Sequence, residues 1–289
     1  MEKKTRVVRR RQMAFASRVA TQIWDEQPSP RNPYLAERCR CRGYDLLELM
    51  EKRSFVDVLF LLFLGELPTK AQAGLLESLM IAFINPGPRH PAARAAIYTG
   101  CGRTNTANIL PVALSVLSGE HLGGAEVTAA MRFLGKHQKD DPGEIADSLL
   151  QHFVPPQDGD RRIAPGFGSR FNGIEPLSRR IAEKLCRLPQ CGAALRWGEA
   201  FADRLASHSM GWLGPGVCAA VFLDLGFAPR AGAGLFQLVC APGLLAHGLE
   251  LADKPVNSIP FLDEEHYIIE PYDGENKSNS MDEASHGTK

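Results

Sequence analysis

The sequence predicts an all-α fold of about a dozen helices. Apolar residues recur at helical spacing along most of the 289-residue chain, and no convincing run alternates between apolar and polar residues as a half-buried strand does. Glycine, proline or asparagine stands at most junctions between these periodic segments. Segments such as residues 217–225 are apolar nearly all round, which indicates burial on every side. We therefore expect helices wrapped around a central buried one, with no substantial sheet.

The first two long helices have clear capping signals. Ser54 is placed to cap the segment "FVDVLFLLFLG", which ends at Gly65. Thr69, followed by Gln72, forms a capping box for "KAQAGLLESLMIAFI". The helical pattern continues, in order, through residues 106–119, 123–137, 143–153, 177–188, 193–208, 214–227 and 235–250.

Charge and hydropathy exclude two classes of partner. Lys and Arg number 33, as do Asp and Glu, so the zero formal charge gives no overall attraction to nucleic acid or to an anionic membrane. The longest apolar stretch, residues 58–64, is far shorter than the roughly 20 residues that cross a bilayer. Six Lys or Arg crowd into residues 3–11, for which a frayed tail is favoured over a targeting or polyanion-binding arm. We expect neither nucleic acid nor a membrane as a partner.

The cysteines indicate a reducing compartment. The chain has seven cysteines, an odd number, and no secretory signal precedes them, so we expect free thiols and a cytoplasmic location. The spacing of Cys39 and Cys41, and of Cys186 and Cys191, is not that of zinc ligands. We therefore expect no metal site.

The chain divides into three parts in this interpretation. Residues 1–42 form a basic N-terminal segment and lead-in, residues 43–274 a helical domain, and residues 275–289 a disordered tail without apolar anchors. Within the helical domain we expect a large lobe and a smaller lobe at about residues 155–240. Loops at residues 157–162 and around Gly166 separate the two lobes in this interpretation.

Six motifs, taken in order, resemble segments of the citrate synthase family. They are "GYDLLELMEKRSFVDVLFLLFLGELPTKAQ" from Gly43, "SGEHLGGAE" from Ser118, "PGFGSRF" from Pro165, then "AAVFLDLGFAP", "LFQLVCAPGLLAHGLE" and "YDG" at Tyr272. No single motif is specific, but their common order is. The short chain and the form "GEHLGGA" are most similar to the citryl-CoA-lyase-like branch.

The resemblance implies a citrate-synthase-like multi-helix fold and a dimer. It also implies an acyl-CoA substrate, no permanently bound cofactor, and formation or cleavage of a carbon–carbon bond. In the family a carboxylate removes a proton from the acyl-CoA, one histidine hydrogen-bonds the enolate oxygen, and a second histidine polarises a keto acid. Arginines hold the carboxylates of that acid.

Several positions that carry this chemistry in the family are replaced. The two histidines correspond to Leu122 and Ser169, and the aspartate to Pro215. The arginines correspond to Leu177, Cys240 and Glu270. Removing one oxyanion donor typically costs about 3 to 4 kcal/mol of transition-state stabilisation, so these losses together leave little of the parent reaction.

The remaining candidates are three catalytic residues and four binding residues. The catalytic candidates are His121, Ser169 and Glu126, and the candidates for CoA or substrate binding are Gly166, Phe167, Gly168 and Arg170. For His121 a structural role is slightly favoured. Glu126 could replace the missing carboxylate or serve the helix dipole. Arg170 could bind a phosphate or acid group, or form a surface ion pair with Glu175.

Two functions remain open. The first is an acyl-CoA carbon–carbon lyase or synthase whose substrate is not citrate. The second is a catalytically inactive family member that serves as a regulatory or structural subunit, in a homodimer or paired with an active relative. The sequence identifies neither the small carboxylic or keto acid nor the direction of reaction.

Overall fold

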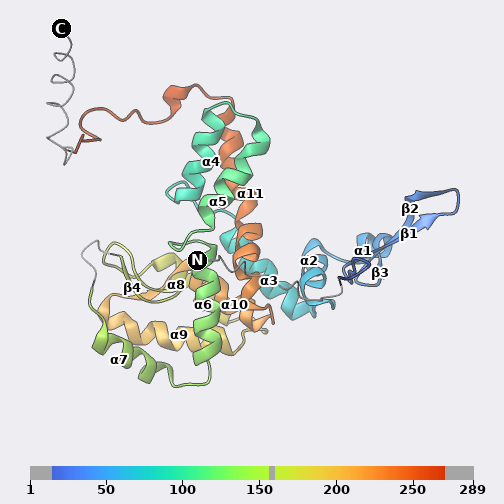
Figure 1. Ribbon diagram of the computed structural model, residues 1–289. Helices are drawn as coiled ribbons and strands as arrows, with labels where there is room; N and C mark the ends of the chain where they lie inside the picture. Colours follow the sequence, from blue (N-terminus) through green and yellow to red (C-terminus); the bar gives the residue numbers. More distant parts are fainter. Residues whose placement is uncertain (1–14, 156–159, 271–289) are drawn as a thin grey trace, which may run out of the picture.

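The computed structural model describes residues 15–155 and 160–270, and its fold is mainly helical, as expected (Figure 1). The helices are α1 (Leu46–Lys52), α2 (Phe55–Leu64), α3 (Lys70–Phe83), α4 (Pro91–Cys101), α5 (Ile109–Leu117), α6 (Gly124–His137), α7 (Pro142–His152), α8 (Pro176–Cys186), α9 (Ala193–Leu205), α10 (Gly214–Asp224) and α11 (Gly232–Ala252). The strands are β1 (Trp24–Ser29), β2 (Asn32–Cys41), β3 (Tyr44–Asp45), β4 (Arg161–Ala164), β5 (Phe167–Ser169) and β6 (Gly211–Trp212).

Both predicted capping motifs are confirmed. Ser54 and Asp57 form a reciprocal capping box at the start of α2, which ends at Gly65 in the left-handed conformation. Thr69 and Gln72 do the same for α3. Local hydrogen bonds therefore fix these boundaries, which is why the sequence predicts them well.

The core lies where α6, α9, α10 and α11 meet. Helix α10 is almost entirely buried, as its all-round apolar sequence predicts, and it packs against α6 and α9. Helix α11 packs against α6 and then runs away from the body between α4 and α5 (Figure 1). The stretch Pro229–Ala252 is long and apolar enough to span a membrane by length and composition, with 39% of that window buried. Within the fold this helix packs against α4, α5 and α6.

A half-buried carboxylate, that of Asp224, fixes the start of α9 against the end of α10. Asp224 accepts hydrogen bonds from the backbone N–H groups of Gly192, Ala194 and Leu195, at 3.1, 2.8 and 3.0 Å. Asp224 therefore serves as the N-terminal cap of another helix, since no side chain of α9 itself caps that end.

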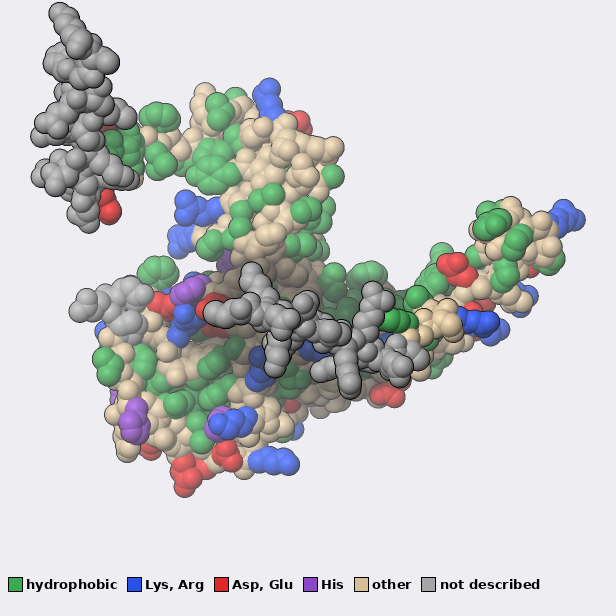
Figure 2. All heavy atoms as spheres, viewed as in Figure 1, with side chains coloured by type: hydrophobic (Ala, Val, Ile, Leu, Met, Phe, Trp, Pro, Cys, Tyr) green, Lys and Arg blue, Asp and Glu red, His purple; other side chains and the backbone are tan. Residues whose placement is uncertain are grey.

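The expectation of no substantial sheet holds only roughly, because two small three-stranded antiparallel sheets are present. Strands β1, β2 and β3 form an arm that projects from the body, and Figure 2 shows hydrophobic side chains on its surface. Since nearly all of β1 and β2 is exposed, these strands have no buried face that would produce an alternating pattern.

The second sheet replaces the loops expected around Gly166. Strand β4 pairs with β5, and β5 pairs with β6. These strands have two to four residues each, too few for periodicity to reveal them. The predicted lobe boundaries stay a prediction, and the predicted tail at residues 275–289 lies outside the described residues.

Helices α4 and α11 approach closely because glycines face each other across the contact. A Cβ atom added to Gly100 would lie 2.0 Å from the carbonyl oxygen of Gly248. No side chain fits there unless the two backbones separate.

We expect Gly100→Ala to lower the free energy of unfolding by about 1–3 kcal/mol, because overpacking outweighs the better helix propensity of alanine. Gly234→Ala on α11 is the matched control, since nothing lies within 4 Å of its added Cβ atom. This control should gain up to about 1 kcal/mol. Urea denaturation of both variants checks the prediction, and equal stability of the two would contradict it.

Candidate functional site

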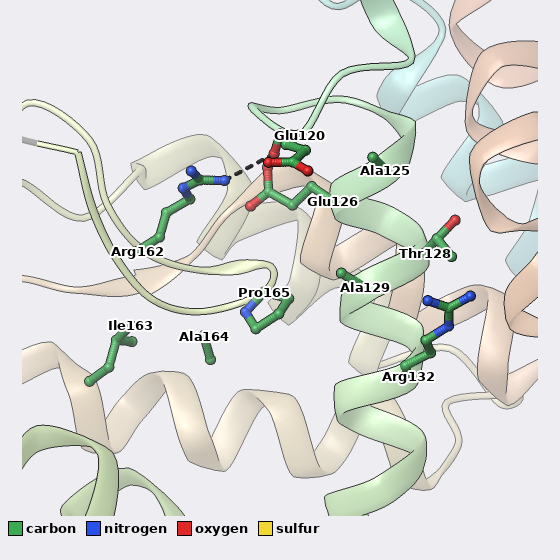
Figure 3. A pocket seen from close by; sticks show the side chains of 10 residues that line it. All are labelled: Glu120, Ala125, Glu126, Thr128, Ala129, Arg132, Arg162, Ile163, Ala164 and Pro165. Carbon is green, nitrogen blue, oxygen red and sulfur yellow. Dashed lines mark hydrogen bonds between the residues drawn. The ribbon is translucent and has the colours of Figure 1, made fainter. Parts of the chain in front are cut away.

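A cavity of about 660 Å³ lies between the first turns of α6 and the strand β4. Its lining residues are Glu120, Ala125, Glu126, Thr128, Ala129, Arg132, Arg162, Ile163, Ala164 and Pro165. Figure 3 shows the residues of α6 along one wall and those of β4 along the other. Each wall includes residues of a motif from the sequence analysis: Glu120, Ala125 and Glu126 belong to "SGEHLGGAE", and Pro165 begins "PGFGSRF".

Glu126 is the buried carboxylate of this cavity, with 3% of its surface exposed. Its Oε2 accepts a hydrogen bond of 2.7 Å from the backbone N–H of Leu122, and its Oε1 a longer one of 3.4 Å from Gly166. Burial raises the pKa of Glu126, while these two N–H groups and the nearby Arg162 and Arg170 partly oppose the shift. The residue thus joins the two walls and has a proton affinity above that of an ordinary glutamate.

Leu122, which the resemblance in sequence aligns with a family histidine, has a backbone that is held on both sides. It has a φ of 55°, the left-handed conformation that leucine rarely adopts. Its N–H donates to Glu126, and its carbonyl oxygen lies 3.3 Å from Nε2 of His90. His90 is itself buried and caps α4.

His121 is not among the lining residues, but it contacts one of them, Arg162, in a polar cluster. Its Nδ1 is 3.0 Å from Asp160 Oδ2, and its Nε2 is 3.4 Å from a terminal nitrogen of Arg162. Arg162 also donates to the carbonyl oxygen of Glu120 and pairs with Asp160. The guanidinium is therefore held in a fixed orientation, with its charge beside Glu126.

The Gly-Phe-Gly segment packs tightly and does not line the cavity with side chains. Phe167 is fully buried against Phe201 and Trp212. Gly166 has a φ of 80°, and a Cβ atom there would lie 2.5 Å from the Cα of Gly216. At Gly168 a Cβ atom would lie 2.3 Å from the carbonyl oxygen of Arg161. Close backbone packing is sufficient to explain both glycines.

Ser169 and Arg170 follow this segment. The Ser169 side chain is buried and donates a hydrogen bond of 3.0 Å to the carbonyl oxygen of Gly173, so its proton is already engaged. Arg170 is half-buried, and its Nε is buried without a hydrogen-bond partner. Among the described residues it forms no ion pair with Glu175, which instead accepts from Ser178. The catalytic role of Ser169 and the binding role of Arg170 stay predictions.

The other positions at which the resemblance predicts a replaced family residue lie outside the cavity lining. Pro215 is buried in the first turn of α10, and Cys240 is buried in α11, where burial raises the pKa of its thiol to about 12. Leu177 is exposed at the start of α8, and Glu270 is exposed at the end of the described segment. None of these side chains supplies a charge to the cavity.

Sequence reasoning missed His90, Asp160, Arg132 and Arg162. The last two line the cavity, and the first two hold its neighbours in place. The dipeptide His90-Pro91 before an alanine-rich stretch was an available signal for a helix start, since proline is favoured at the first helical position. Nothing local distinguishes the other three.

No protein-family model and no curated protein sequence matches the chain. Among solved structures, the chain is similar to citryl-CoA lyase from Hydrogenobacter thermophilus, with 25% identity and a TM-score of 0.70 over 88% of this chain and 96% of that one. ATP citrate lyase from Methanothrix soehngenii, solved with citrate and coenzyme A, has 18% identity and a TM-score of 0.65 over 89% of this chain and 44% of that one.

A third similar structure is citrate synthase from Thermoplasma acidophilum, solved with carboxymethyl-CoA and oxaloacetate. It has 19% identity and a TM-score of 0.57 over 76% of this chain and 58% of that one. At such identities the last two structures demonstrate the shared fold alone. Of the three, the citryl-CoA lyase has the greatest likeness in both sequence and structure.

Glu126 should make stability depend on pH. Because the pKa of Glu126 is higher in the folded chain than in the unfolded chain, folding favours its protonated form. Its stabilising contribution is therefore present at low pH and is lost as pH rises through the folded pKa. Glu126→Gln removes this titration, so the stability of the wild type relative to the variant should fall with rising pH above about 4.3.

Urea denaturation between acidic and neutral pH measures this difference. Each pH unit between the two pKa values should remove about 1.4 kcal/mol. Glu77→Gln, on the exposed surface of α3, is the matched control for the substitution. A wild type that gains stability over Glu126→Gln as pH rises would contradict the prediction.

Proposed function

We propose that this citrate-synthase-like chain, whose likeness to a citryl-CoA lyase exceeds its likeness to a citrate synthase, acts on an acyl-CoA other than citryl-CoA by forming or breaking a carbon–carbon bond. The observation that carries the proposal is the buried carboxylate of Glu126 in the wall of the cavity. It takes the place of the family carboxylate whose position is occupied by Pro215.

Glu126 has the properties required of a general base. Its carboxylate is oriented by two backbone N–H groups, and burial raises its pKa toward the range in which a base accepts a proton efficiently at neutral pH. In the synthetic direction, its oxygen takes a proton from the carbon beside the thioester carbonyl. The C–H electron pair becomes the enolate, whose negative charge the fixed guanidinium of Arg162 stabilises.

The two arginines of the cavity suit an anionic ligand. Arg132 lies on α6 and Arg162 on β4, and both line the cavity. In Figure 3 Arg162 lies on the β4 side of α6, and Arg132 on the other side of this helix. Guanidinium groups bind phosphate and carboxylate oxygens well, and coenzyme A carries phosphates. The ATP citrate lyase and citrate synthase structures each contain coenzyme A or a derivative, which supports the same ligand class here.

The acid partner differs from citrate in this proposal. The family positions that hold a citrate-like acid are occupied by Leu177, Cys240 and Glu270, and none of them supplies a cation. A small carboxylic or keto acid with fewer carboxylates than citrate fits this loss.

A catalytically inactive subunit is the second candidate. The engaged hydroxyl of Ser169 and the buried thiol of Cys240, with its pKa raised to about 12, favour it because neither group is free to transfer a proton. Assays of acyl-CoA turnover separate the two candidates. Turnover that Glu126→Gln lowers by about 10²–10⁴-fold supports the enzyme, and binding without turnover supports the inactive subunit.

We also propose a cytoplasmic dimer. All seven cysteines are free, as expected in a reducing compartment. Large apolar side chains are exposed on α5, at Val112 and Val116, and on α11, at Leu238 and Leu249. A two-fold contact would bury them.

Light scattering of the purified chain tests this assembly. We expect twice the mass of one chain at micromolar concentration. A monomer would exclude the homodimer and leave only a pair with a related subunit, which co-expression of the two chains would detect.

Calorimetric titration tests the ligand class directly. We expect the chain to bind acetyl-CoA and free CoA, and to bind oxaloacetate weakly or not at all. Arg132→Gln should weaken CoA binding by about tenfold, because a charged hydrogen bond is lost. Arg94→Gln, exposed on α4 away from the cavity, should bind as the wild type does. If none of the three ligands gives a heat of binding, the proposal is wrong.

A further inference from the structure

The imidazole of His90 makes two hydrogen bonds that fix its tautomer. Its Nδ1 accepts from the backbone N–H of Ala92 at 3.1 Å, so Nδ1 carries no proton. Its Nε2 lies 3.3 Å from the carbonyl oxygen of Leu122, and a carbonyl only accepts. The ring is therefore neutral with its proton on Nε2. It joins the N-terminus of α4 to a turn 32 residues later in the chain.

The turn at Leu122 needs external support. The left-handed conformation is unfavourable for a residue with a Cβ atom, and Leu122 adopts it with a φ of 55°. Glu126 accepts from its N–H, and His90 donates to its carbonyl oxygen, so the two peptide groups that define this conformation are both held. The conformation aims the Leu122 N–H at the carboxylate of Glu126.

We propose that His90 is a positioning residue for Glu126: by holding Leu122 in the left-handed conformation, it keeps the Leu122 N–H on the carboxylate that moves the proton. The inference rests on the proposed function only in the statement that Glu126 moves a proton. The contacts among His90, Leu122 and Glu126 exist without any ligand.

A simple capping role does not explain a histidine at this position. Asn, Asp, Ser and Thr are the preferred N-caps, and each caps through a short side chain. The imidazole adds a second nitrogen on the far side of the ring, which reaches the Leu122 carbonyl while the first caps α4. His90 is 8% exposed, and both nitrogens are used.

The surroundings keep the ring in the required neutral form. Burial lowers the pKa of His90, and the charge of Arg170 acts in the same direction, against the hydrogen bond to Leu122. A doubly protonated ring would present an N–H to the N–H of Ala92 and lose the cap. The cap and the contact to Leu122 therefore require the same protonation state.

Two substitutions separate positioning from capping. His90→Asn keeps a good N-cap for α4, but its side chain is too short to reach the Leu122 carbonyl. His90→Ala removes both contacts. Exchange of the Ala92 amide proton reports the cap, and the ¹³C resonance of the Glu126 carboxyl group, followed through a pH titration, reports the environment of the base.

We expect the titration midpoint of Glu126 to rise by about one pH unit in both variants, which is about a tenfold fall in its acid dissociation constant. This is the effect of losing one hydrogen bond to the ionised form. The Ala92 amide should stay protected in His90→Asn and lose protection in His90→Ala. An unchanged Glu126 midpoint in His90→Asn, with the Ala92 amide protected, would make His90 a cap and nothing more.

One measurement needs no variant. The ¹⁵N shifts of the His90 imidazole in the wild-type chain should report a protonated Nε2 and an unprotonated Nδ1, and the opposite tautomer overturns the proposal. Since neither titration nor tautomer requires substrate, a failure here is distinct from a failure to bind CoA. If the chain binds no CoA while both results hold, the proposed function falls and the positioning of Glu126 stands.

Discussion

The hydrogen bonds of one buried carboxylate connect the elements on which this site depends. Glu126 projects from the first turn of α6, accepts from the turn before that helix, and accepts again from the turn between β4 and β5. Two contacts with the start of α10 also fix the β4–β5 turn. The carbonyl oxygen of Gly166 accepts a hydrogen bond from the N–H of Leu213, and the Cα of Gly166 packs on Gly216. The cavity walls and the core helix α10 are thus linked through a few backbone contacts around a single ionisable group.

Helix positions were largely predictable from the sequence because local interactions set them. The caps at Ser54 and Thr69 form within one turn, and the apolar sequence of α10 directly reflects its burial. The strands were not predictable in the same way. The exposed ribbon of β1 and β2 presents no buried face, and β5 has only three residues, two of them flanking a glycine. Asp224 shows a third case, in which a helix cap comes from a residue about 30 positions away.

In the site, too, the residues with local signals were predictable and those with distant partners were not. Glu126 was recognisable as an acidic residue beside a glycine pair, in a motif with a family resemblance. His90 and Asp160 were not, because their partners Leu122 and His121 lie more than 30 residues away in sequence. The glycines of "PGFGSRF" suggested room for a ligand, but the structure uses them for contacts between backbones, and the serine between them and Arg170 donates inward to Gly173. A glycine-rich motif therefore records a close approach without saying whether a ligand or the chain itself approaches.

The long bond between Glu126 and Gly166 has a mechanical consequence. At 3.4 Å it bridges the two walls of the cavity, one on α6 and one on the β4–β5 turn. A movement that separated the two walls would lengthen this bond, and a carboxylate that loses an N–H donor retains its proton more strongly. The separation of the walls and the proton affinity of Glu126 are linked through this one contact.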